Sequence, residues 1–348
     1  MQTDHAVRIL TLNGGGVRGL FTISVLAELE RILEETNGEK DVKIGDYFDL
    51  IAGTSIGGIL ALGLAKGCSA RELKETFFKS APLIFPRYIF FDRLIKTIKK
   101  AIGPSYSSQP LREAIVKMIG EDTTFNDLQR RVIIPAVNLS TGRPQFFKTP
   151  HNPDFYRDGN ILLLDAALAT SAAPTYFSPH YCKEFKAYFA DGGLVANDPS
   201  FVALHEVFGD MKLDFPSITH SDIHILNVGT MANEYSIRPQ VLASKNQGYF
   251  GLWGNGEKLV LTTMTSNQLL HQNMLTRELK ANNSFHNYIS IDDQVPNEAA
   301  QDITLDNSSS ASLDNLASRG KHKADEVYAK NQKLKQIFSI KAKTFQRI

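Results

Sequence analysis

A serine between two glycines, placed between an apolar strand-like run and an apolar helix-like run, constrains this chain more than any other feature. Residues 53–57 read Gly-Thr-Ser-Ile-Gly, follow the run 48–52 and precede a helix pattern at 59–65. Strand, sharp turn, serine and helix in this order are typical of a nucleophile elbow. The start of the helix would offer free amides and a positive dipole end to an oxyanion. We therefore expect a serine hydrolase, with the alternative that Ser55 only caps the helix.

The order of apolar patterns predicts an α/β fold. The 348 residues are 43% hydrophobic and 22% charged, which is enough for a sizeable core. Strand and helix patterns alternate in the first part of the chain, and this alternation favours a parallel sheet covered by helices. No segment clearly divides the chain, so we predict one domain over 1–348. Strands are expected at 7–12, 48–52, 131–137, 145–148, 188–190 and 222–229, and helices at 20–32, 59–65, 70–80, 165–173, 256–280 and 313–338.

Charge and cysteine content exclude several classes of protein. The net charge of +1 gives no reason to expect nucleic-acid binding. The two cysteines, Cys68 and Cys182, stand outside any metal-ligand spacing and indicate a reducing compartment. The polar start at 1–5 lacks the features of a secretion signal, and no apolar run is long enough for a membrane span. We expect a cytoplasmic protein that needs no metal or other cofactor.

A glycine cluster at 14–19, Gly-Gly-Gly-Val-Arg-Gly, has two functional interpretations and the alternative of a plain tight turn. It satisfies the dinucleotide-binding pattern Gly-x-Gly-x-x-Gly, with Glu34 as the candidate ribose-binding acid. However, Glu34 falls in a predicted helix, whereas that acid should end a second strand. The other interpretation is an anion site, because consecutive glycines at a helix start expose their amides. The residues that would carry it are Gly14, Gly15, Gly16 and Arg18.

A serine nucleophile needs a general base, and the sequence offers two kinds of candidate. None of the nine histidines stands in a recognisable triad context. Asp191 follows a short apolar strand and precedes Gly192 and Gly193, which would let its carboxylate approach another backbone closely. In a dry pocket such a carboxylate can take the proton of a serine hydroxyl. The alternative is that Asp191 is an ordinary turn residue.

The three motifs, taken as one ordered set, closely resemble those of the patatin-like phospholipase family. The resemblance runs from about 7 to 197 and includes Asn-Asp-Pro at 197–199. It implies a three-layer α/β/α sandwich with a mostly parallel central sheet, and a lipid acyl hydrolase that cleaves fatty-acyl esters of glycerophospholipids. By this resemblance the core covers about 7–230, and 231–348 is a helical C-terminal part. The implied residue roles are Ser55 as nucleophile, Asp191 as base, Gly14, Gly15, Gly16 and Arg18 as oxyanion hole, and Gly53, Gly57, Gly192 and Gly193 as turn glycines.

The same resemblance implies a regulatory setting. The length of the chain is similar to that of bacterial members, some of which are effectors of anti-phage defence that cyclic dinucleotides switch on. No motif in the chain binds a nucleotide by a mechanism that we can name, and oligomerisation remains open. A different class of function is a non-catalytic nucleotide or lipid sensor on the same fold, although both Ser55 and Asp191 are present.

An amphipathic segment offers a route to lipid. Apolar residues in 88–102 fall largely on one helical face, and lysines and an arginine occupy the rest. This pattern is typical of a helix that lies on an anionic bilayer. We expect peripheral contact with the inner membrane through this segment. The alternative is an ordinary amphipathic helix packed on the sheet.

Overall fold

One mixed sheet organises the protein, and it has eight strands among the described residues. The computed structural model describes residues 6–86, 103–155, 157–231, 239–243, 248, 251–254, 256–295 and 303–345. The strand order is β5-β6-β3-β2-β1-β7-β8, with β4 also paired to β3. The strands are β1 (Val7–Leu12), β2 (Leu50–Gly53), β3 (Arg131–Asn138), β4 (Arg143–Lys148), β5 (His180–Cys182), β6 (Ala187–Asp191), β7 (Ile223–Val228) and β8 (Tyr288–Ile291).

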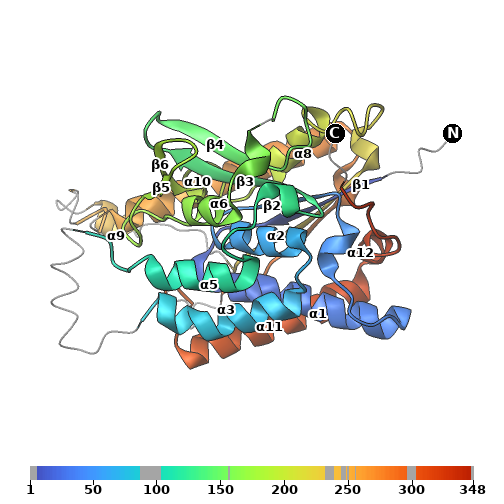
Figure 1. Ribbon diagram of the computed structural model, residues 1–348. Helices are drawn as coiled ribbons and strands as arrows, with labels where there is room; N and C mark the ends of the chain where they lie inside the picture. The colour runs from blue at the N-terminus through green and yellow to red at the C-terminus, as the bar shows by residue number, and fades with distance from the viewer. Residues whose placement is uncertain are drawn as a thin grey trace.

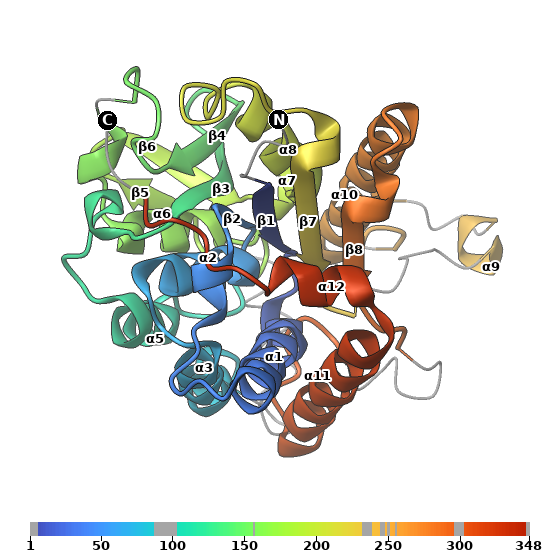
Figure 2. The same cartoon turned by 90° about the vertical axis from the view of Figure 1, so that its right-hand side faces the viewer.

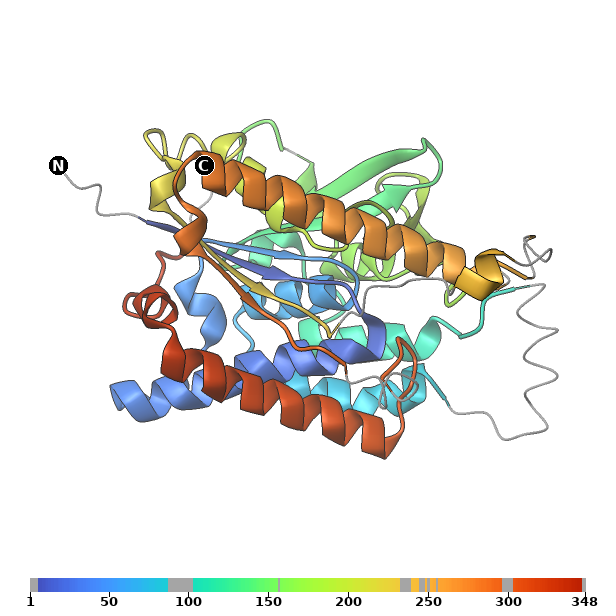
Figure 3. The same ribbon diagram turned by 180° about the vertical axis from the view of Figure 1, so that it is seen from behind.

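Helices cover both faces of the sheet, as Figures 1 and 2 show. The helices α1, α2, α3, α5 and α11 lie on one face, while α8 and α10 lie on the other. In Figure 3 the long helix α10 crosses the strands on the side opposite α1 and α11. The helices are α1 (Gly19–Asn37), α2 (Ile56–Lys66), α3 (Ala70–Ile84), α5 (Gln109–Ile119), α6 (Leu163–Thr170), α7 (Gly193–Ala196), α8 (Ser200–Phe208), α9 (Pro239–Leu242), α10 (Glu257–Ala281), α11 (Ser310–Lys330) and α12 (Gln332–Ile337).

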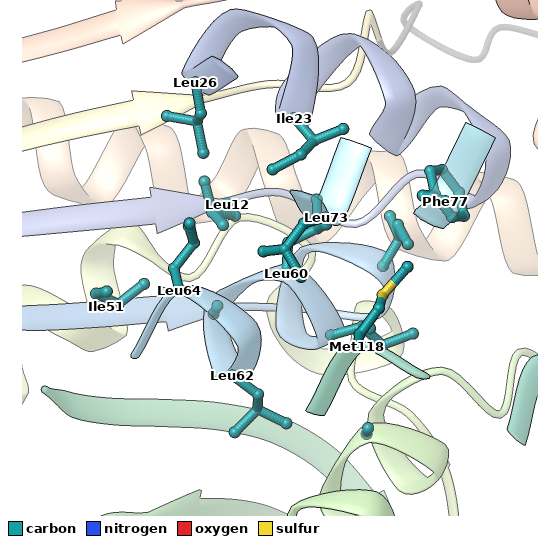
Figure 4. Packing of buried hydrophobic residues seen from close by; sticks show 14 of the residues in the cluster. Leu12, Ile23, Leu26, Ile51, Leu60, Leu62, Leu64, Leu73, Phe77 and Met118 are labelled. Carbon is teal, nitrogen blue, oxygen red and sulfur yellow. The ribbon is translucent and has the colours of Figure 1, made fainter. Parts of the chain in front are cut away.

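The central strands are apolar because both of their faces are buried. In β1, Leu10 and Leu12 belong to the larger core, while Val7 and Ile9 face the smaller core on the opposite side. The larger core fills the space between the sheet and the helices on the α1 face, which include α2, α3 and α5 (Figure 4). Its members include Leu12 and Ile51 from the strands, Ile23 and Leu26 from α1, Leu60 and Leu64 from α2, Leu73 and Phe77 from α3, and Met118 from α5.

The α/β class and the three layers predicted from the sequence are confirmed, with more antiparallel pairing than expected. β1, β2, β3, β7 and β8 are parallel, but β4 and β6 are antiparallel to β3. The sequence patterns did not predict β5, β8, α5 or α8. The expected amphipathic segment 88–102 lies outside the described residues. Within the described ranges, no helix combines the length and the apolar character that a membrane crossing requires.

Candidate active site

The turn between β2 and α2 presents Ser55 at the carboxyl edge of the sheet. Ser55 has φ 56° and ψ −125°, a strained conformation with positive φ for a residue with a Cβ atom. The neighbouring structure holds this strain: the Ser55 amide donates to Thr170 Oγ1 at 3.0 Å. The Thr170 hydroxyl in turn donates to the carbonyl of Pro135 in β3 at 2.6 Å. The turn is therefore a nucleophile elbow anchored to the adjacent strand.

The two glycines of the elbow leave no space for a side chain. A Cβ atom on Gly57 would lie 2.3 Å from the carbonyl oxygen of Leu12, and one on Gly53 would lie 2.1 Å from the carbonyl oxygen of Gly57. Both obstacles are backbone atoms, which cannot rotate away. The glycines let α2 pass directly over the end of the sheet and fix the direction of the serine.

We expect Gly57→Ala to lower the free energy of unfolding by about 3 kcal/mol or more, because the added methyl group must displace β1 or α2. Urea unfolding followed by circular dichroism measures this change. Gly103→Ala is the matched control, since a Cβ atom on Gly103 meets no atom within 4 Å. Equal stability of the two variants would contradict the close approach.

A short hydrogen bond joins the serine to the predicted acid. Ser55 Oγ donates to Asp191 Oδ2 at 2.7 Å, across 136 positions of the chain. Asp191 ends β6 and is completely buried, and its other oxygen, Oδ1, accepts the amide of Gly193 at 2.6 Å. Burial raises the pKa of Asp191 to about 7, although the hydrogen bonds from Gly193 and Ser55 act to lower it. A carboxyl group with this pKa can both accept and release a proton near neutral pH.

One short segment, 170–172, connects the elbow to the acid turn. The amide of Gly192 donates to the carbonyl of Thr170 at 3.1 Å, and the amide of Asp191 donates to that of Ala172 at 3.0 Å. A Cβ atom on Gly192 would lie 2.1 Å from the carbonyl oxygen of Pro135, so this turn also sits tightly on β3. Thr170 thus bonds both to Ser55 and to Gly192, the residue next to Asp191. No sequence motif marked it, because its role depends on tertiary contacts alone.

The glycine cluster forms a loop beside Ser55. A Cβ atom on Gly14 would lie 3.5 Å from the Cβ of Ser55. The Gly14 amide already donates to the carbonyl of Asn197 at 3.0 Å, which differs from the expectation that this amide is free for an oxyanion. The amides of Gly15 and Gly16 have no hydrogen-bond acceptor in the described part of the chain. Just after them, the amide of Val17 donates to the carbonyl of Leu305 at 2.8 Å.

Arg18 adds positive charge to this loop. Its Nε atom lies 3.4 Å from the carbonyl of Gly15, and the side chain lines the same cavity as Ser55. Burial lowers the pKa of Arg18 to about 10, partly offset by the nearby Asp292 and Tyr176, so the guanidinium stays protonated at neutral pH. Among the described residues, no carboxylate forms an ion pair with it. Its charge is therefore available to an anionic group in the cavity.

A cavity of about 460 Å³ contains the dyad, the glycine loop and Arg18. This volume lies within the usual range for ligand sites, and most of the lining is apolar. α3, α10 and the segment 303–306 supply much of the wall. The apolar residues that line it include Ile59, Phe77, Ile84, Phe85, Phe177, Val260 and Met264.

Two of the alternatives that the sequence left open, a dinucleotide site with Glu34 and a histidine base, receive no support from this geometry. Glu34 lies inside α1, where it forms two hydrogen bonds with Arg71 of 2.6 and 2.8 Å, so it does not act as a ribose-binding acid. Across the described ranges, no histidine lines the cavity. The same ranges contain no cluster of histidine, cysteine or carboxylate side chains that could hold a metal ion.

Comparison with known proteins places this geometry in context. The model of the protein family described as patatin-like phospholipase matches residues 10–204. A protein of Escherichia coli (strain TW11681) called cGAMP-activated phospholipase is 61% identical over 342 residues, which cover 98% of this chain and 95% of that protein. A Vibrio cholerae protein with the same name is 60% identical over 98% of this chain and 97% of its own length. A third, from Pseudomonas aeruginosa, is 39% identical over 92% and 88% of the two chains.

Proposed function

The chain belongs to the patatin-like phospholipase family and is a lipid acyl hydrolase, and we propose that Ser55 and Asp191 are its catalytic dyad. The hydrogen bond of 2.7 Å between Ser55 Oγ and Asp191 Oδ2 is the observation that carries this proposal. It lies in an apolar cavity, where a carboxylate can serve as the base for a serine without a histidine. The substrates are the fatty-acyl esters of glycerophospholipids.

In the first half of the reaction, Asp191 Oδ2 takes the proton of Ser55 while Oγ attacks the acyl carbonyl carbon. The tetrahedral intermediate then collapses, and the lysophospholipid oxygen leaves with the proton that Asp191 held. In the second half, a water molecule gives a proton to Asp191 and attacks the acyl-serine. The fatty acid leaves, and the proton returns to Ser55 Oγ.

The oxyanion of each intermediate is stabilised by the glycine loop. The amides of Gly15 and Gly16 supply hydrogen-bond donors, and Arg18 supplies positive charge from the same wall of the cavity. Gly14 contributes differently: its bond to Asn197 ties the loop to the segment after the acid. Gly53, Gly57, Gly192 and Gly193 shape the turns that carry the serine and the acid.

A cyclic dinucleotide, cGAMP, switches this activity on in bacterial anti-phage defence. The names of the relatives from E. coli and V. cholerae support this part of the proposal, since both are called cGAMP-activated phospholipases and match nearly the whole chain. The catalytic domain covers 1–348, because α10 and Leu305 complete the cavity from the C-terminal part. Contact with the inner membrane is peripheral, and 88–102 remains the segment that we predict to make it.

Mass spectrometry of reaction products tests the proposal. Vesicles of phosphatidylethanolamine and phosphatidylglycerol are incubated with the purified protein, with and without cGAMP. We expect free fatty acid and lysophospholipid from the wild type with cGAMP, and at least about 10-fold less without it, an activation of the order of 1.4 kcal/mol or more. Equal product in both conditions would leave the hydrolase in place and refute the activator. No product in either condition would contradict the hydrolase itself.

A further inference from the structure

Helix α10 is hydrogen-bonded to the chain segment that follows the acid. Asn267 Nδ2 donates to the carbonyl of Gly193 at 2.6 Å, and Asn267 Oδ1 accepts the amide of Asn197 at 2.9 Å. Four residues further along α10, His271 Nδ1 lies 3.3 Å from the carbonyl of Asp198. Of these side chains, only that of Asn267 bonds to two separate peptide groups.

The position of the Asn267 amide is unusual. In a continuous α-helix, the amide of Asn197 would donate directly to the carbonyl of Gly193, four residues earlier. Here the side chain of Asn267 lies between these two groups and bonds to both. The short helix α7 accordingly spans Gly193–Ala196. A residue of α10 therefore fixes both ends of this turn.

One end of the turn contacts the acid Asp191, and the other end contacts the glycine loop. At one end, the Gly193 amide donates to Asp191 Oδ1 at 2.6 Å. At the other end, the carbonyl of Asn197 accepts the Gly14 amide at 3.0 Å and so holds the glycine loop. Asn267 bonds to the other backbone polar group of each residue, the carbonyl of Gly193 and the amide of Asn197.

We propose that Asn267 is a positioning residue for the hydrolysis reaction. It keeps the carboxylate of Asp191 and the glycine loop in the correct positions relative to Ser55. The inference rests on the proposed function, because it takes Ser55 and Asp191 as the dyad. Asn267 itself need not touch substrate, since it acts through the peptide groups of Gly193 and Asn197. No motif of the sequence contains this residue.

A merely structural role, the attachment of α10 to the body of the protein, makes a different prediction. α10 has other anchors to the same segment: Gln268 Oε1 accepts Asn197 Nδ2 at 2.8 Å, and Gln272 Nε2 donates to Asp198 Oδ2 at 2.9 Å. If attachment alone mattered, the loss of the Gln272 bond would have the same consequences as the loss of the Asn267 bonds. If Asn267 positions the acid, only its own loss should disturb the titration of Asp191.

The test uses full-length protein with cGAMP and p-nitrophenyl butyrate as substrate. Asn267→Ala removes both bonds and adds no charge. We expect it to lower kcat by about 10- to 100-fold with KM within about 2-fold, because a displacement of about 1 Å at reacting groups has effects of this size. Asn273→Ala is the matched control, since Asn273 is an exposed asparagine of the same helix. We expect it to retain wild-type kcat.

The pH dependence of kcat/KM is the decisive second readout. The Gly193 amide favours the ionised form of Asp191, so a turn that is no longer held should raise the pKa of this acid. In Asn267→Ala the acid limb should move up by about 0.5 to 1 pH unit. In Gln272→Ala it should stay at the wild-type pH. Asn267→Ser is measured alongside, because its hydroxyl keeps one possible donor, and its kcat should fall between those of alanine and asparagine.

Two results would overturn the inference: wild-type kcat and pH limb in both Asn267 variants, or an equal loss in Asn267→Ala and Gln272→Ala with unshifted limbs. If Asn267→Ala does not fold, as judged by circular dichroism, Asn267→Ser decides by the same criteria. Ser55→Ala in the same assay separates this inference from the proposed function. Turnover by Ser55→Ala would refute the dyad, whereas an inactive Ser55→Ala beside fully active Asn267 variants would refute only the positioning role.

Discussion

Ser55→Ala is expected to lower kcat/KM for phospholipid hydrolysis by at least about 10⁴-fold, because it removes the atom that forms the acyl-enzyme. The fold should be unaffected, since the Ser55 amide, which bonds to Thr170, is retained. Release of fatty acid in the presence of cGAMP measures the loss. Labelling with a fluorophosphonate probe gives a second readout that does not depend on lipid presentation. The wild type should be labelled and the variant should not.

Ser80→Ala is the control for this prediction. Ser80 is also a buried serine, but it lies on α3, outside the residues that line the cavity. This variant should keep both hydrolysis and labelling. Labelling of Ser55→Ala at the wild-type level would contradict the assignment of the nucleophile. If the wild type is not labelled either, even with cGAMP, the result would favour the non-catalytic sensor.

Asp191→Asn is expected to lower the activity of the enzyme and to raise its stability. Without the base, kcat/KM should fall by at least about 10³-fold at neutral pH. In the wild type, kcat/KM should rise with pH through about 7, where Asp191 loses its proton. A rate that is independent of pH between 5.5 and 8.5 would argue against Asp191 as the base.

The same substitution should make the protein more stable at alkaline pH. The pKa of Asp191 is raised from 3.8 to about 7 by burial, so the folded state holds this proton more tightly than the unfolded state. As the pH rises from about 4 to 7, the carboxyl group ionises in the unfolded chain but stays protonated in the folded protein, so the free energy of unfolding falls progressively, by up to about 4 kcal/mol. Asparagine carries no such charge. The gain of Asp191→Asn in free energy of unfolding should be larger at pH 8.5 than at pH 5.5, as urea titrations at both values would measure. A gain that does not change with pH would contradict the raised pKa.

The parts of the site that could be predicted are those whose geometry requires particular residue types. Only glycine fits where a Cβ atom would meet backbone oxygens, as at Gly57 and Gly192. Such positions appear in the sequence as glycines close to Ser55 and Asp191. The central strands were predictable for a similar reason, because burial on both faces of the sheet requires continuous apolar runs.

The other parts of the site depend on contacts between distant segments. Thr170 and Asn267 are ordinary polar residues in sequence. Thr170 binds Ser55, which lies 115 positions away, and the partners of Asn267 lie 70 and 74 positions away. The helix expected over 165–173 ends at Thr170, where the chain bends to hold both the elbow and the acid turn. The antiparallel direction of β6 could not be predicted either, because an apolar run carries no information about the direction of a distant neighbour. The direction of β4 differs in this respect, since the short connection 139–142 from β3 allows only an antiparallel pair.

The contact between Val17 and Leu305 determines when the active-site cavity is completed during synthesis of the chain. The serine, the glycine loop and the acid leave the ribosome before α10 and Leu305, which close the wall of the cavity. A chain still in synthesis therefore carries every reactive group but lacks a finished pocket. We expect a polypeptide that stops short of this point to leave the lipids of its own cell intact.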